Sequence, residues 1–220
     1  MARRTLTLVL VAGGLLLAAS TASGNLLWND PQAMAGWSGT QEFFNTDGDF
    51  TIHATVQYAV YAPGQYAGVD PSGGTEYVYA YQVFNTSEPG VEEISKLSIG
   101  ISLLSGAHNI QFDSSAGAPG LPGGIDPSNI RLSGSSARWN FDDNTIFYGG
   151  YSTVLLFTSA AGPRWASGSI QDGGLADTRT MPSPSLLTEV PEPMTLVLLA
   201  AGALCMVTAK GRGLKLRRGH

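Results

Sequence analysis

The stretch FTIHATVQYAV, residues 50–60, decides the fold class, because apolar and polar side chains alternate along it. One set comprises Phe50, Ile52, Ala54, Val56, Tyr58 and Val60, and the other comprises Thr51, His53, Thr55 and Gln57. A period of two residues puts successive side chains on opposite faces of a β-sheet. We therefore expect the first set to face a core and the second to face water.

Later stretches repeat the strand pattern. In KLSIGISLL, residues 96–104, an apolar set again alternates with a small or polar one: Leu97, Ile99, Ile101 and Leu103 against Ser98, Gly100 and Ser102. EYVYAYQVF, residues 76–84, is aromatic and β-branched, which is typical of a strand covered on both faces or flanked by aromatic cross-strand pairs. Shorter candidate strands begin at Asn109, Ala137, Thr145, Ser152 and Ala166.

Segments rich in Gly, Pro, Asn, Asp and Ser separate these candidate strands, and they favour turns over helices. No long helical period occurs between residues 25 and 185. About eight short strands at this spacing predict an all-β domain over residues 25–173, an antiparallel β-sandwich or jelly roll.

The chain begins with the pattern of a secretory leader. Arg3 and Arg4 precede an apolar run, residues 5–19, which gives way to the small residues STASGN. This order predicts a signal peptide over residues 1–24, which signal peptidase removes after Ala22 or Gly24. The alternative, an uncleaved membrane anchor, is disfavoured because a spanning helix needs roughly 20 apolar residues.

The part between the two ends is strongly acidic and has no cysteine. All 17 acidic residues lie between Asp30 and Glu192, and the only cysteine, Cys205, lies near the C-terminus. The basic residues of this part are Lys96, Arg131, Arg138, Arg164 and Arg179. We expect such a surface to repel nucleic acid and anionic lipid, and either to attract cations or only to keep the protein soluble. No internal disulfide can form.

The C-terminal part predicts a spacer and a short membrane helix. Residues 174–189 are polar and contain prolines, which is typical of an extended spacer. Residues 194–209 carry no charge. A helix of that length spans roughly 24 Å at about 1.5 Å per residue, just enough to cross a thinned bilayer. The basic residues that follow should stay cytoplasmic and leave the β-domain outside: Lys210, Arg212, Lys215, Arg217 and Arg218.

The tail carries a resemblance to a known sorting signal. It has Val190-Pro191-Glu192-Pro193, then an apolar run that begins Met-Thr-Leu and contains Gly202, then clustered arginines. Over residues 190–218 this resembles the PEP-CTERM signal of certain Gram-negative bacteria. The resemblance implies a transient inner-membrane anchor, cleavage by an exosortase, which is a membrane-embedded cysteine transpeptidase-like enzyme, and delivery to the cell surface or extracellular matrix. The prolines also favour the extended backbone that a protease cleft binds.

One candidate ion site lies in NTDGDF, residues 45–50. Asn45, Asp47 and Asp49 stand at alternate positions and offer the oxygen ligands that calcium prefers. Phe50 occupies the place of the EF-hand glycine, so a polar turn is the competing interpretation.

Candidates for carbohydrate chemistry are also few. Glu88, Glu92 and Glu93 could furnish a glycosidase pair. Seven aromatic residues could line a sugar-binding platform or fill the core: Tyr58, Tyr61, Tyr77, Tyr79, Tyr81, Trp139 and Trp165.

Two functions follow from these patterns. The first is an exported, noncatalytic surface or matrix protein without a cofactor, with exopolysaccharide as a candidate partner and no nucleic acid. The alternative is an exported carbohydrate-active or calcium-dependent glycan-binding protein. Carboxylates about 5 to 10 Å apart in a groove of exposed aromatic rings would favour a hydrolase, and buried rings would favour the first function.

Overall fold

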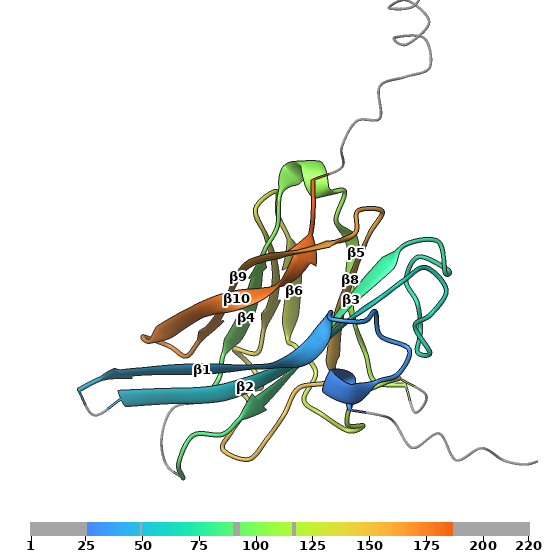
Figure 1. Ribbon diagram of the computed structural model, residues 1–220. Helices are drawn as coiled ribbons and strands as arrows, with labels where there is room; N and C mark the ends of the chain where they lie inside the picture. The colour runs from blue at the N-terminus through green and yellow to red at the C-terminus, as the bar shows by residue number, and fades with distance from the viewer. Residues whose placement is uncertain (1–25, 49, 90–92, 116–117, 187–220) are drawn as a thin grey trace, which may run out of the picture.

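The computed structural model describes residues 26–48, 50–89, 93–115 and 118–186, and they form two five-stranded antiparallel sheets (Figure 1). The first sheet contains, in spatial order, β1 (Ser38–Asp47), β2 (Phe50–Tyr61), β3 (Tyr77–Asn85), β8 (Val154–Ser159) and β5 (His108–Asp113). The second contains β10 (Ala176–Pro184), β9 (Pro163–Gln171), β4 (Lys96–Gly100), β7 (Ser136–Asn140) and β6 (Asn129–Leu132). The predicted all-β fold is confirmed, and the two sheets are consistent with a β-sandwich.

Two short 3₁₀ turns accompany the strands, η1 (Leu27–Asn29) and η2 (Leu103–Ser105). Within the described ranges, no helix has the length and apolar character needed to cross a membrane. The predicted signal peptide and the predicted helix at 194–209 lie outside the described residues.

The alternation in β2 is confirmed over most of its length. Ile52, Ala54, Val56 and Val60 are fully buried and belong to the core between the sheets. The pattern fails at both ends of the strand, because Phe50 is 59% exposed at the hairpin tip and Tyr61 is buried on the opposite face. A second, smaller core on that face explains the burial of Tyr61.

Strand β3 is covered on both faces, as its composition predicts. Tyr79, Tyr81 and Val83 belong to the main core. Val78 and Ala80 belong to the smaller core, which also contains Leu27 and Tyr66. The segments before β1 and between β2 and β3 therefore seal the outer face of the first sheet.

The alternation predicted for residues 96–104 stops early. Leu97 and Ile99 are buried in β4, but Leu103 is 80% exposed in η2. The chain turns here because Ser102 caps η2 and Gly106 adopts the left-handed conformation with φ 62°, which glycine tolerates best.

Three strand assignments differ from prediction, two of them at sheet edges. β1 and β6 were not predicted, because edge strands carry many exposed polar residues and lack a clear alternation. The predicted strand at 145–149 is wrong, since Ile146 makes only an isolated bridge to Ile94.

The predicted spacer at 174–189 is also wrong for most of its length. Residues 176–184 form β10, which pairs with β9 from Ala176↔Gln171 to Pro184↔Pro163, so the domain extends past residue 173. Pro182 and Pro184 fit because β10 is the edge strand of its sheet, where a missing N–H breaks no ladder. Residues 187–189 lie outside the described residues.

Candidate functional site

The predicted calcium ligands do not come together as a complete site. Asn45 donates from Nδ2 to the Ala176 carbonyl at 2.7 Å and accepts from the Thr46 N–H at 2.8 Å. Asp49 lies outside the described residues. Among the residues that the structure describes, no group of three or more His, Cys, Asp or Glu side chains could hold a metal ion.

Asp47 instead lines a pocket of about 440 Å³ between two hairpin tips, which we call the hairpin-tip pocket. The β1–β2 hairpin contributes Asp47 and Phe50, and the β9–β10 hairpin contributes residues 172–175. Figure 1 shows both hairpins projecting toward the same side of the molecule. A volume in this range suits a small ligand, such as one or two sugar units.

The polar wall of the hairpin-tip pocket is Asp172. Its side chain is only 7% exposed, and Oδ1 accepts from the N–H groups of Gly174 and Leu175 at 3.0 and 2.8 Å. This local bonding is what turns the chain between β9 and β10. The other oxygen, Oδ2, is buried without a hydrogen-bond partner. Of the two carboxylates in the pocket lining, the exposed one is Asp47, and it lies beside the apolar side chains of Phe50 and Leu175.

Side chains of β10 hold the two hairpins together. Asp177 Oδ2 accepts from the Phe44 N–H at 2.8 Å, and Arg179 donates to the Phe44 carbonyl at 3.3 Å. Asp177 and Arg179 also form an ion pair at 2.8 Å. These contacts, which we call the edge latch, occupy both backbone groups of Phe44 on the edge strand β1 and so shield them from another chain.

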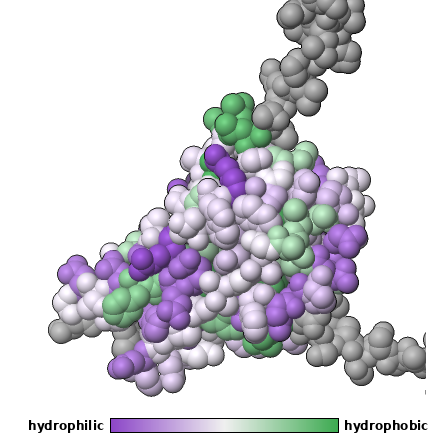
Figure 2. Space-filling model, in the orientation of Figure 1, coloured by the Kyte–Doolittle hydropathy of each residue, from purple (hydrophilic) through white to green (hydrophobic). Residues whose placement is uncertain are grey.

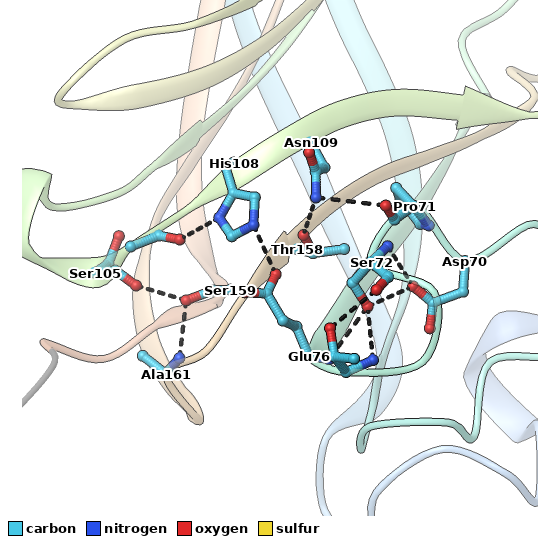
Figure 3. Close-up of polar contacts among 12 residues, drawn as sticks. Asp70, Pro71, Ser72, Glu76, Ser105, His108, Asn109, Thr158, Ser159 and Ala161 are labelled. Atoms are coloured by element: carbon cyan, nitrogen blue, oxygen red, sulfur yellow. Dashed lines mark hydrogen bonds and ion pairs between the residues drawn. The ribbon is translucent and has the colours of Figure 1, made fainter.

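A second polar cluster joins the β2–β3 connection to β5 and β8 (Figure 3). His108 Nδ1 lies 2.7 Å from the Gly106 carbonyl and Nε2 lies 2.9 Å from Glu76 Oε2. Asn109 donates to Thr158 Oγ1 at 3.2 Å. These contacts fasten the β2–β3 connection to β5 and β8.

Most of the predicted aromatic platform is core. Tyr61, Tyr79, Tyr81 and Trp139 are fully buried, and burial raises the pKa of the Tyr81 phenol well above its ordinary value. Tyr58 and Tyr77 are half-buried.

Trp165 differs from the other predicted aromatic residues, because it is 48% exposed. It stacks on Trp37 at 5.0 Å and meets Tyr58 edge-on at 5.9 Å. Sequence reasoning missed Trp37, which precedes the unpredicted β1 and so had no strand to place it.

The two candidate glycosidase carboxylates that the structure describes do not line the hairpin-tip pocket. Glu88 and Glu93 are exposed, and Glu92 lies outside the described residues. Glu93 accepts a hydrogen bond from Thr145 Oγ1, and neither Glu88 nor Glu93 lines the hairpin-tip pocket.

The sorting residues Val190, Pro191, Glu192 and Pro193 and the basic cluster from Lys210 to Arg218 lie outside the described residues. No family model matches the chain, and no curated protein or solved structure matches it either.

Proposed function

We propose that this protein is an exported, noncatalytic cell-surface or extracellular-matrix protein, sorted by its C-terminal PEP signal. The observation that carries the proposal is the order of segments: a leader, an all-β domain, Val-Pro-Glu-Pro, an uncharged run and a basic end. Leader and basic end independently give the same orientation, with the β-domain outside.

The tail has a physical logic as a temporary anchor. Residues 194–209 are just long enough to hold the chain in a bilayer, and the five basic residues after them oppose complete translocation. Pro191 and Pro193 keep the intervening backbone out of the helix and available to a membrane protease. An exosortase-type enzyme is the partner that this arrangement fits.

The folded domain suits a protein that works outside the cell. Its core closes without a disulfide, because nineteen buried side chains form one continuous cluster between the sheets. The edge latch occupies backbone groups of β1, and Pro182 and Pro184 lack the N–H groups through which another chain could pair with edge strand β10. These features favour a domain that stays folded and separate from its copies.

Intact-mass analysis of the secreted and membrane fractions tests the proposal. We expect a mature form that starts near Ser23 or Asn25 and ends near Pro193. A surface form that still carries Arg217 and Arg218 would contradict C-terminal processing, and one that still carries Arg3 and Arg4 would contradict the leader.

The hairpin-tip pocket favours a second candidate function, glycan binding. An exposed aromatic ring, Phe50, stands beside the exposed carboxylate of Asp47, and this combination can stack on a sugar ring and accept bonds from its hydroxyls. A glycan array of the secreted protein tests it. Phe50→Ala should abolish binding, and Phe147→Ala, which removes a ring that is 54% exposed outside the pocket, should not.

A further inference from the structure

Turn η2 forms an apolar projection, which we call the leucine tip and define as Leu103 and Leu104. Their side chains are 80% and 67% exposed, more than any other large apolar side chain in the described ranges. Figure 2 shows the projection as a hydrophobic knob beside the point where the grey C-terminal trace leaves the surface. Solvent exposure of two adjacent leucines is unfavourable and calls for a covering surface.

The leucine tip is firmly held, so its exposure is a property of the fold. Ser102 accepts from the Leu104 N–H and caps the turn. Ser159 on β8 donates from Oγ to the Ser105 carbonyl, and both serines are fully buried. Gly134 lies so close to Leu103 that a methyl group there would meet Leu103 Cδ2 at 2.3 Å.

The chain leaves the domain beside this tip. Ser183 donates from Oγ to the carbonyl of Gly100, just before η2, at 2.6 Å, and the Ser185 N–H donates to the Gly162 carbonyl at 2.8 Å. The last described residue is Leu186, which is 45% exposed. Figure 1 likewise shows the end of β10 next to η2.

The length of the connection limits how far this end can lie from a membrane. Seven residues, 187–193, separate Leu186 from Met194, where the uncharged run begins. The eight steps from Leu186 to Met194, at 3.3 to 3.6 Å each, reach about 29 Å at most. If the run is in the bilayer, Leu186 and the leucine tip beside it stay within that distance of the membrane.

The charges of the described residues fit that orientation. Exposed acidic side chains gather where the strands end on the opposite side of the molecule: Asp47, Glu88, Glu93, Asp126, Asp142 and Asp143. The tip end has three carboxylates: Glu76 pairs with His108, Asp30 is buried and accepts from the Tyr61 hydroxyl at 2.8 Å, and Asp70 is half-buried and accepts from the Ser72 N–H and hydroxyl at 2.8 and 2.7 Å. The exposed carboxylates thus lie mainly at the far end, so an anionic surface at the tip end would meet less like charge than one at the far end.

We propose that the leucine tip inserts into the bilayer interface while the tail anchors the protein, which seats the domain on the membrane with its acidic end outward. This inference rests on the proposed function, because it needs an anchored tail. Two leucines alone give only weak, reversible membrane binding, but the short tether keeps their local concentration high. Cleavage of the tail removes that advantage, so the domain leaves the membrane when it is processed.

Lipid-quenching measurements on the full chain test the proposal. With Cys205→Ser as background, Ser135→Cys carries a fluorophore in the turn beside Leu103, and Asn144→Cys carries it at the opposite end. The chain is reconstituted in vesicles of phosphatidylethanolamine and phosphatidylglycerol that contain quencher-bearing lipid. We expect strong quenching at position 135 and little at position 144.

A matched pair of variants shows whether the leucines cause the quenching. Leu103→Ser with Leu104→Ser should lower the ratio of docked to undocked domain by roughly ten-fold or more. As a control, Phe147→Ser with Tyr148→Ser removes two adjacent, exposed aromatic side chains at the far end. It should leave quenching at position 135 unchanged.

Three other outcomes would each overturn the docked tip. A chain that floats with the vesicles but shows no quenching at position 135 overturns the docked tip and leaves the anchor standing. Disulfide cross-linking between copies of the unlabelled Ser135→Cys variant would show that a second copy covers the tip, which also overturns the proposal. A chain that does not float with the vesicles contradicts the anchor, and the docked tip is overturned with it.

Discussion

The two ends of the sandwich present opposite chemistry although the same strands run through both. One end has the leucine tip and the point where the chain leaves β10. The other end has the hairpin-tip pocket and most of the exposed carboxylates. The strands between them supply one continuous core. The difference therefore arises in the connections, which can change their surface chemistry without disturbing the core.

This contrast predicts how the domain is oriented relative to the membrane in the proposed arrangement. The tip end would face the bilayer while the tail is anchored, and the pocket end would face outward, where glycans are found. We expect substitutions in four places to affect this contrast. From the largest effect to the smallest, these places are the tail, the core, the buried contacts of the tip end and the edge latch.

The largest effect should come from the tail, because the tip end faces a membrane only if the tail holds it there. Replacing Pro191 and Pro193 by Ala lets the helix extend through Glu192 and hides the extended backbone. We expect this variant to stay uncut in the membrane fraction. Replacing Lys210, Arg212, Lys215, Arg217 and Arg218 by Ser removes the cytoplasmic stop, and we expect release with the tail still attached.

Fractionation separates these outcomes if an epitope follows Leu186, beyond the last described residue and ahead of the PEP motif. A position inside residues 176–184 would disrupt β10 and is unsuitable. If both variants were cut and exported like the parent, the tail would be neither an anchor nor a protease site.

The next largest effect should come from the core that both ends share. Val56 is fully buried between the sheets, so Val56→Asp should lower the free energy of unfolding by about 3 kcal/mol or more. Thr55 points to the other face and pairs with Glu42 on β1, so Thr55→Asp should cost less than about 1 kcal/mol, mainly through like-charge repulsion. Urea unfolding of the secreted protein measures both losses. Equal losses would contradict the strand's register.

The sequence predicts the interior strands of both sheets and the edge strand β5 but misses the edge strands β1, β6 and β10. β2 and β3 can be predicted from the sequence. Burial of one face imposes alternation on β2, and burial of both faces imposes an apolar composition on β3. β10 is hidden because Pro182 and Pro184 look like linker residues until an edge position is known. Leu103 follows the alternation of β4, and only the turn signals Ser102 and Gly106 indicate that it leaves the sheet.

The candidate sites were less predictable than the strands. Asp47 was identified as a possible ligand, but its pocket partner Asp172 lies far along the chain and meets it only through tertiary packing. The leucine tip and the chain exit at Leu186 are likewise joined by the register of β9 and β10 and by the bond from Ser183 to Gly100. A single sequence specifies local periodicity, and it does not specify which loops meet at an end of the sandwich.

A smaller effect should come from the buried phenols of the outer core. The pKa of Tyr61 is raised above its ordinary value of 10.0 first by burial and then by the nearby Asp30 carboxylate, which accepts its hydrogen bond. Because the folded state favours the neutral phenol, this stabilisation is complete below pH 10 and is lost as the pH rises above it. The contribution of Tyr61 to the melting temperature should therefore stay constant up to about pH 9 and decrease above pH 10.

Tyr61→Phe sharpens that measurement. It leaves an oxygen of the buried Asp30 without its donor and should cost about 1 to 3 kcal/mol at neutral pH. It should also make the alkaline fall shallower, because one group with a raised pKa is gone. A variant whose alkaline fall is as steep as the parent's would show that the folded state does not hold the Tyr61 phenol neutral.

The smallest effect on stability should come from the edge latch at the pocket end. The side chains of Arg179 and Asp177 are 42% and 14% exposed, so water screens most of their attraction, and Arg179→Ala should lower the free energy of unfolding by less than about 1 kcal/mol. The Arg179→Ala substitution should affect assembly more than stability. The Phe44 carbonyl on edge strand β1 then loses the Arg179 donor and becomes free to pair with another chain.

Light scattering over a concentration series measures this association. It should show more association for Arg179→Ala than for the control Arg138→Ala, which changes an exposed arginine on β7, an interior strand of the second sheet. Equal association of the two variants would mean that the latch only bridges the hairpins, and a loss above about 2 kcal/mol would mean that it holds the pocket end together.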